Sequence, residues 1–137
     1  LRVKPDAAGR AAVAAFVEPT YLHQVVVGNA TTGEVRKRYV DLPDALADSD
    51  AADPDDEWRV HFHLPLHASP GAPFSDTRDN LLDTLDWMKA HPDACQHAEM
   101  ETYTWEVLPS ALRIGIEDQL VREYEWTLES LKSRGLA

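Results

Sequence analysis

Apolar residues recur with a helical period in three segments of this chain. Residues 7–16 are rich in alanine and predict a short helix. A second helix is predicted between residues 76 and 91, capped by Asp76 or Thr77, and a third from about Ile116 to Arg134, stopped by Gly135. Each of the last two helices has one apolar stripe that is expected to face the core: Leu81, Leu82, Leu85 and Met88; and Leu120, Tyr124, Leu128 and Leu131.

Four other segments have the composition or the alternation of strands. Residues 21–27 and 35–40 are rich in β-branched side chains, and the glycine-containing run 28–33 between them is typical of a turn, so we predict a hairpin. Residues 58–65 and 97–105 alternate side chains with a period of two. These four segments make the fold a mixture of strands and helices.

The two alternating segments flank the second predicted helix, an order that favours a strand, a crossover helix and a parallel second strand. We therefore predict an α/β fold with a parallel pair. Residues 44–57 contain seven acids and no base, and this run predicts a solvated loop. The length of 137 residues suits a single domain spanning residues 1–137.

Alternation places His61 and His63 on one face of their strand, and Glu99, Glu101 and Tyr103 on one face of theirs. In a parallel pair, both sets would meet at the same end of the sheet. Imidazoles and carboxylates together are ligands for a divalent ion, so the sequence predicts a metal site. Its predicted ligands are His63, Glu101 and His61.

Each of these residues also has an ordinary structural interpretation. Alternating histidines occur on polar strand faces, and Glu99 would pair equally well with Arg59 or a lysine. His23 is more simply a hydrogen-bonded packing residue than part of a site. Tyr103 and Trp105 would line a substrate pocket, or simply belong to the core.

The composition narrows the classes of partner. With 24 acidic and 13 basic residues the formal charge is -11, which disfavours nucleic acid and anionic membranes. No apolar run approaches the roughly 20 residues of a membrane helix, and no signal peptide is recognisable, so membrane insertion is not expected and the predicted location is cytoplasmic. Cys95 is the single cysteine, so any metal must be held by nitrogen and oxygen. Because the sequence begins at Leu1, we expect it to be the remainder of a longer chain.

Several long motifs carry a resemblance to a known family. They are Tyr21–Val26, Asp41–Pro43, Val60–Leu66 and Glu99–Pro109. In these motifs the chain resembles the carboxyl-terminal part of EboE-type metabolite traffic proteins, which belong to the xylose-isomerase-like TIM-barrel superfamily. The resemblance spans nearly the whole chain and fades over residues 44–57.

The resemblance implies the carboxyl-terminal portion of a (β/α)8 barrel with an added β-hairpin, since a whole barrel needs about 250 residues. It implies that Glu101 and His63, and less directly His61, hold a divalent ion such as Zn, Mn or Mg. Neither histidine lies in the usual superfamily motif.

The function expected from these observations is that of a metal-dependent isomerase or epimerase acting on a small polyhydroxylated or carbonyl metabolite. Glu99 and His61 would move the proton, and His23, Tyr103 and Trp105 would line the substrate pocket. The alternative is a non-catalytic protein that binds or escorts a metabolite. An incomplete barrel exposes strand edges, so the expected protein partners are the remainder of the barrel or a second copy of the chain.

Overall fold

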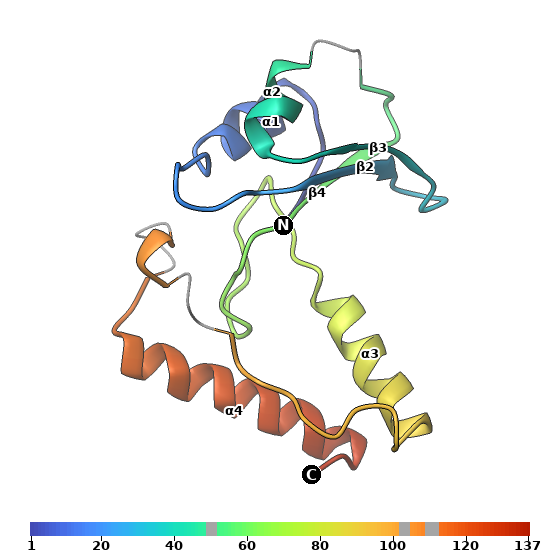
Figure 1. Cartoon of the computed structure of the whole chain (residues 1–137), viewed down its shortest axis with the longest axis vertical. Coiled ribbons are helices and arrows are strands. Elements are labelled where there is room, and N and C mark those ends of the chain that lie inside the picture. Colours follow the sequence, from blue (N-terminus) through green and yellow to red (C-terminus); the bar gives the residue numbers. More distant parts are fainter. Residues whose placement is uncertain (49–51, 102–104, 109–112) are drawn as a thin grey trace. The chain divides into compact units, whose positions relative to one another are not determined.

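The structure is a computed structural model that describes residues 1–48, 52–101, 105–108 and 113–137. These residues form two compact units (Figure 1). The sheet unit comprises Leu1–Phe62 and Ser69–Asp76, and the helical unit comprises His63–Ala68 and Thr77–Ala137.

A four-stranded antiparallel sheet forms the centre of the sheet unit, in the order β1-β4-β2-β3. Its strands are β1 (Arg2–Val3), β2 (Val25–Asn29), β3 (Val35–Tyr39) and β4 (Asp56–Val60). The predicted hairpin is confirmed, because β2 and β3 pair antiparallel across the predicted turn. The sheet and its helices confirm the predicted mixed α/β class. All pairings between the described strands are antiparallel, so the predicted parallel pair is not found among the described residues.

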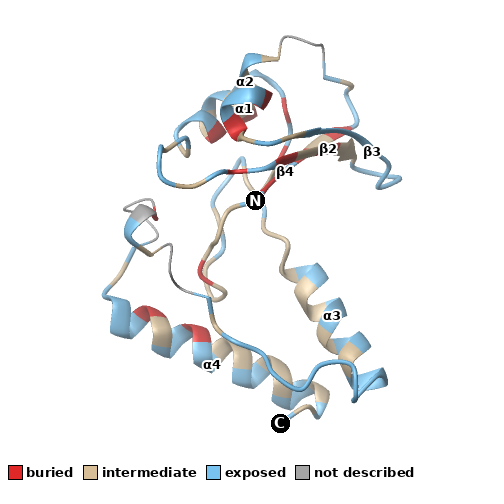
Figure 2. Ribbon diagram, viewed as in Figure 1, coloured by how far each residue is buried: buried red, intermediate tan, exposed pale blue. Residues whose placement is uncertain are grey.

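Two short helices cover one side of this sheet (Figure 1). They are α1 (Ala7–Ala14), which was predicted, and α2 (Leu42–Ala47). The buried apolar residues of the unit gather where these helices meet the sheet (Figure 2): Val3, Val13, Val25, Val27, Leu42, Ala45, Trp58 and Val60. Alternate strand residues thus supply the core, as the period of two requires.

The prediction of a solvated loop over residues 44–57 is wrong at both of its ends. At the start, α2 includes Asp44, and at the end, Asp56 and Glu57 belong to β4. The Asp41 carboxylate accepts the Leu42 N–H and caps α2. A proline is tolerated in the first turn of a helix, so Pro43 does not prevent α2 from forming. Residues 49–51 lie outside the described part.

The strand predicted over residues 58–65 ends at Val60. Val60 pairs with Val25, the first residue of β2. The His61 N–H still donates to the Gln24 carbonyl oxygen at 2.9 Å, but beyond it β2 has no further residue to pair with. His61 and His63 therefore do not lie on a strand, although their alternation suggested one.

The helical unit contains α3 (Arg78–Ala90), a 3-10 helix over Trp105–Val107, and α4 (Ile116–Arg134). Both α-helices were predicted. The apolar stripe of α3 is its less exposed face, as expected. Gly135 ends α4 with a φ of 70°, a left-handed conformation that glycine adopts without strain.

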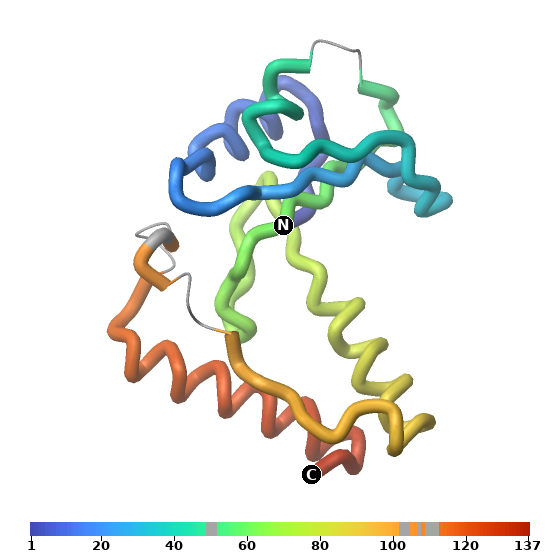
Figure 3. Tube along the Cα trace, in the orientation of Figure 1, coloured from blue at the N-terminus to red at the C-terminus, as the bar shows by residue number. Residues whose placement is uncertain are grey.

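The predicted inward face of α4 is wrong in part. Tyr124 is 53% exposed and Leu128 is 44% exposed, whereas Gln119 and Glu123 are buried. After α3, the chain runs along α4 (Figure 3). In this segment the Met100 sulfur lies 3.5 Å from the Thr127 hydroxyl of α4. The face of α4 that packs within the unit is therefore the one that carries Gln119, Glu123 and Thr127, not the predicted apolar stripe.

The strand predicted over residues 97–105 is not found where the chain is described. Residues 97–101 have no regular secondary structure, and Trp105 begins the 3-10 helix. Alternation predicts a strand when one face is buried, but Glu99 and Glu101 are both exposed. Residues 102–104, which include Tyr103, lie outside the described residues.

Candidate functional site

His63 and Glu101 lie close together in the helical unit. The His63 Nδ1 atom is 3.6 Å from the Glu101 Oε2 atom. Their side chains are 24% and 68% exposed, respectively, so the imidazole is the more enclosed partner. The two residues that carried the metal prediction are therefore neighbours, although neither lies on a strand.

The segment that carries His63 is held against α4. The buried Glu123 carboxylate accepts the Leu66 N–H at 3.2 Å. From α3, the Arg78 guanidinium donates to the Leu66 carbonyl oxygen at 3.4 Å. Both backbone polar groups of Leu66 are thereby bonded, which fixes the position of the chain just after His63.

His67 follows in the same segment, and its Nδ1 atom is buried without a hydrogen-bond partner among the described residues. Burial and the positive charge of Arg122 lower the pKa of His67, against an opposing effect of Glu123. The neutral form of the His67 imidazole is therefore favoured, four residues after His63.

The separation of His63 and Glu101 suits two ligands of one metal ion. Two ligands of a tetrahedral ion with bonds near 2.0–2.1 Å lie roughly 3.4 Å apart, close to the observed 3.6 Å. Within the described ranges, however, no group of three or more histidine, cysteine, aspartate or glutamate side chains could hold a metal ion. These residues therefore provide two donors, and the same distance also fits an ion pair with a protonated imidazole.

The two predicted catalytic residues, His61 and Glu99, belong to different units. His61 belongs to the sheet unit, where its Nδ1 atom is 2.9 Å from the Gln24 Oε1 atom. Glu99 belongs to the helical unit and is exposed. Arg59, the alternative partner suggested for Glu99, pairs instead with Glu57 at 3.0 Å.

His23 makes the contacts of a packing residue. It is only 5% exposed, and its Nδ1 atom lies 3.1 Å from the His61 carbonyl oxygen. The ring lies 4.8 Å from the Phe62 ring, and its Nε2 atom is 3.4 Å from the Glu18 carboxylate. These contacts support the structural interpretation of His23, and its role in a substrate pocket stays a prediction.

Trp105 is also engaged by its neighbours. Its indole N–H donates to the Ile114 carbonyl oxygen at 2.9 Å. The Arg113 guanidinium lies 5.6 Å from the ring centre, so one face of the indole carries a cation–π contact. A ligand that stacks on this face would have to displace Arg113.

The sheet unit also contains a cleft that the sequence did not predict. Its volume is about 500 Å³. Three cationic and three anionic side chains contribute to its lining, together with two aromatic ones: Arg10, Arg36, Lys37, Asp48, Asp53, Asp56, Tyr39 and Trp58. No histidine is among the described residues that line it.

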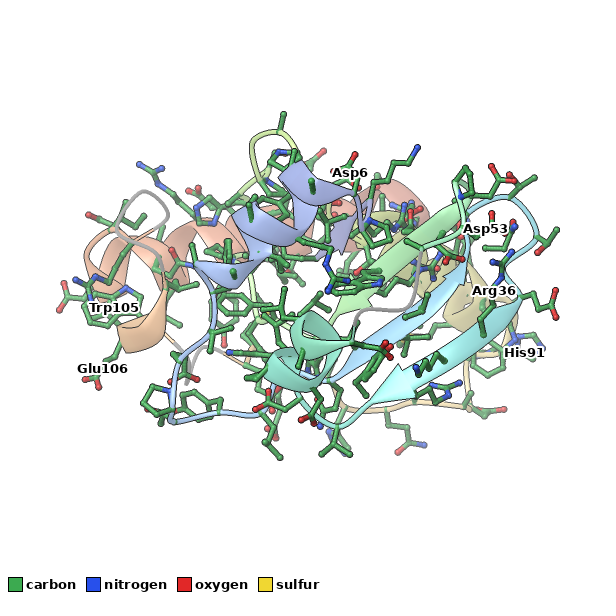
Figure 4. All side chains as sticks on the ribbon, turned by 90° about the horizontal axis from the view of Figure 1, so that it is seen from above. Asp6, Arg36, Asp53, His91, Trp105 and Glu106 are labelled. Carbon is green, nitrogen blue, oxygen red and sulfur yellow. The ribbon has the colours of Figure 1, made fainter. Side chains whose placement is uncertain are left out.

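Apart from Arg10, the charged side chains of this cleft are paired with one another. Arg36 of β3 lies 3.0 Å from both Asp53 and Asp56, and Figure 4 shows Arg36 beside Asp53. Lys37 pairs with Asp48, which also accepts the Tyr39 hydroxyl at 2.6 Å. The basic run of β3 followed by the acidic run was the sequence signal for this network.

These contacts shift the pKa values of the groups involved. A hydrogen bond from the Asp55 N–H, together with Arg36, lowers the pKa of Asp53. Burial and the hydrogen bond to Asp48 raise the pKa of Tyr39. The network therefore favours charged Asp53 and neutral Tyr39 at neutral pH.

Comparison with known proteins adds no relative. The sequence matches no protein-family model and no curated protein, and the structure matches no solved structure. In the described part of the chain, no helix is both long enough and apolar enough to cross a membrane.

Proposed function

We propose that the chain contributes two ligands to a divalent metal site of an isomerase- or epimerase-like protein acting on a small polyhydroxylated or carbonyl metabolite. The observation that carries the proposal is the 3.6 Å separation of His63 Nδ1 and Glu101 Oε2. His63 and Glu101 would hold Zn, Mn or Mg. When bound, the ion would supply Lewis-acid chemistry at a carbonyl or hydroxyl oxygen.

Proton movement is assigned to Glu99 in this proposal. Glu99 is an exposed carboxylate of the helical unit, two positions before Glu101, and would act as the acid–base group. His61, the other residue expected to move the proton, belongs to the sheet unit and has no role in this site.

Equilibrium dialysis against Zn²⁺, Mn²⁺ and Mg²⁺ tests the metal site directly. We expect His63→Ala and Glu101→Ala each to weaken binding of the preferred ion by at least about tenfold, because each removes one of two donors. His97→Ala is the matched control, since His97 is exposed and its ring makes no hydrogen bond or ion pair with the described residues. Equal affinities for all three variants would contradict the proposal.

The alternative function is binding of a metabolite without turnover, and the cleft of the sheet unit favours it. The cleft offers paired charged side chains and the Tyr39 hydroxyl, which can hydrogen-bond to the hydroxyl groups of a metabolite, and its described lining includes no imidazole. Titration with a panel of pentoses and hexoses, followed by NMR, tests it. Shifts at Tyr39 and Trp58 that Arg36→Gln removes would support binding there, whereas shifts confined to His63 and Glu101 would favour the metal site.

The resemblance to EboE-type proteins supports the proposal that the chain is the carboxyl-terminal portion of a xylose-isomerase-like barrel. Such a barrel requires parallel strands, while β1 to β4 pair antiparallel. An experimentally determined structure with a parallel strand added beside these elements would support the barrel. One that keeps only the antiparallel sheet would overturn it.

A further inference from the structure

Three arginines lie in one row across the sheet of the sheet unit. Arg2 of β1 is paired with Arg59 of β4. Arg59 is also paired with Val26 of β2, and Val26 is paired with Arg38 of β3. Residues that are paired across neighbouring strands point to the same face of a sheet, so these four side chains share one face.

This face is the one opposite α1 and α2, the described helices of the sheet unit (Figure 1). The strand residues beside the row belong to the buried face that these helices cover: Val3, Val25, Val27, Trp58 and Val60. On the opposite face, Arg38 is exposed and the Arg59 side chain is 51% exposed. We call this face the arginine face, and its strand residues are Arg2, Val26, Gly28, Val35, Arg38, Glu57 and Arg59.

Cations outnumber anions on the arginine face. Glu57 is the single acid among its strand residues, and the Glu57 Oε1 atom lies 3.0 Å from Arg59 Nε. Arg38 makes no hydrogen bond or ion pair with the described residues. Arg2 lies directly opposite Arg59, an arrangement of like charges that opposes strand pairing. A chain with a formal charge of -11 thus carries a cationic face that an acidic partner would stabilise.

The spacing of the row matches the width of an α-helix. Arg38 and Arg59 lie on the two strands that flank β2, so their backbones are two strand spacings apart, or about 10 Å. An α-helix with its side chains is about 10–12 Å wide. A helix that lies along β2 would therefore cover Val26 and have one of these cations on each side.

A small hollow beside Val26 offers space for an apolar side chain. Its volume is about 70 Å³, and five residues of the arginine face contribute to its lining: Val26, Gly28, Val35, Glu57 and Arg59. Gly28 contributes no side chain, and Val35 is 46% exposed. An apolar side chain in this hollow would remove the two valines from water. The arginine face therefore combines an apolar centre with cationic sides.

We propose that the arginine face docks an acidic amphipathic α-helix of a partner protein. The apolar stripe of that helix contacts Val26 and Val35, and acids beside the stripe pair with Arg38 and Arg59. The contact is small, so binding is weak, with dissociation in roughly the micromolar range or above. The arginine face lies in the sheet unit, whereas His63 and Glu101 lie in the helical unit, so the proposal does not depend on the metal site.

Charge favours a single helix over larger anionic partners. An anionic membrane or a nucleic-acid duplex extends far beyond the arginine face. It would bring its negative charge against the rest of a chain that has 24 acidic and 13 basic residues. A helix that lies along β2 contacts the cationic face alone.

NMR titration of the whole chain with two synthetic peptides tests the proposal. The acidic peptide has about 18 residues, with leucines on one helical stripe and glutamates beside them, and the basic peptide has lysines in place of the glutamates. The acidic peptide should shift the backbone amide signals of Val26, Val35 and Arg38, whereas the basic peptide should not. Equal shifts with both peptides, or no shift with the acidic one, would overturn the proposal.

Arg38→Glu tests the contribution of charge. We expect it to weaken binding of the acidic peptide by at least about threefold, because a carboxylate replaces the cation. Lys89→Glu is the matched control, since Lys89 of α3 is also exposed and the substitution changes the net charge equally. Equal weakening by the two variants would show a general effect of net charge and would contradict docking on this face.

Val35→Ser tests the apolar centre of the contact. We expect it to weaken binding of the acidic peptide by at least about twofold, because less apolar surface is buried. Val121→Ser is the control, since Val121 of α4 is an exposed valine at 56%. If Val35→Ser leaves the affinity unchanged, the face binds acidic charge without an apolar stripe, and docking of an amphipathic helix is wrong.

Two further measurements distinguish other occupants of the arginine face. Co-sedimentation with vesicles that contain phosphatidylserine should leave the chain in solution, and sedimentation equilibrium should show no self-association that Arg38→Glu removes. Vesicle binding that Arg38→Glu removes would assign the face to a membrane, and self-association that it removes would assign the face to a second copy. Either result would overturn the proposal.

Discussion

The guanidinium of Arg10 lies 4.9 Å from the centre of the Trp58 ring, and its Nη2 atom also donates to carbonyl oxygens at the end of α2. The distances to the Leu46 and Asp48 oxygens are 2.8 and 2.9 Å. One side chain of α1 thus contacts the sheet and satisfies the carbonyl groups that end α2. The planar guanidinium can stack on the ring and donate to the carbonyl oxygens at the same time.

We predict that Arg10→Ala lowers the free energy of unfolding by about 1–3 kcal/mol, through loss of these hydrogen bonds and of the cation–π contact. Urea denaturation measures the change. Arg38→Ala should change stability by less than about 0.5 kcal/mol, because the Arg38 side chain is exposed and makes no hydrogen bond or ion pair with the described residues. Equal effects of the two variants would contradict this role for Arg10.

Gly9 lies where α1 approaches the preceding backbone. A Cβ atom at this position would be 1.9 Å from the Lys4 carbonyl oxygen and 2.9 Å from a methyl group of Val3. We predict that Gly9→Ala destabilises the protein by at least about 2 kcal/mol, because backbone has to move. Thermal unfolding of Gly71→Ala provides the control, since a Cβ there meets nothing within 4 Å.

The imidazole of His67, which is half-buried and whose Nδ1 atom is enclosed, should make stability depend on pH. Its pKa is lowered from 6.5 in the folded chain, so the unfolded chain binds more protons as pH falls below about 6.5. Stability contributed by the neutral ring is therefore present above that pH and is lost as pH falls through the lowered pKa. His67→Gln should flatten this part of the pH profile measured by urea denaturation, and His97→Gln should not. Identical pH profiles for His67→Gln and the unaltered protein would contradict this role of His67 in the pH dependence of stability.

Local signals predicted α4 correctly. The acids of its first turn, the bases Lys132 and Arg134 of its last turn and the left-handed Gly135 all lie within or next to the helix. The end of β4 was predicted wrongly because it depends on where β2 begins, which the alternation of residues 58–65 does not record. The inward face of α4 was likewise set by partners distant in sequence.

The same distinction applies to the candidate site. The closeness of His63 and Glu101 was predicted from a parallel sheet, but the 3.6 Å separation arises between segments without regular secondary structure. The cleft was missed because it requires Arg36 and Lys37 to meet carboxylates beyond α2, and α2 itself was not predicted. Side-chain chemistry was readable from the sequence, whereas the contacts that position it were not.

The hydrogen bond from Leu66 to Glu123 links the stability of the helical unit to the candidate metal site. Glu123 is 5% exposed, and its Oε1 atom accepts the Leu66 N–H at 3.2 Å. We predict that Glu123→Ala lowers the free energy of unfolding by about 1–3 kcal/mol, because a backbone donor loses its acceptor. It should also weaken ion binding by His63, since the segment after His63 loses this attachment.

Glu123→Gln separates these two effects from a general loss of packing. Its amide oxygen still accepts the Leu66 N–H, so it should recover most of the lost stability and of the ion affinity. Urea denaturation and dialysis on the same preparations give both readouts. Recovery of stability without recovery of ion affinity would mean that the Glu123 charge, rather than the position of Leu66, supports the metal site. If Glu123→Ala changes neither the free energy of unfolding nor the affinity for the ion, the hydrogen bond between Leu66 and Glu123 does not stabilise the segment after His63.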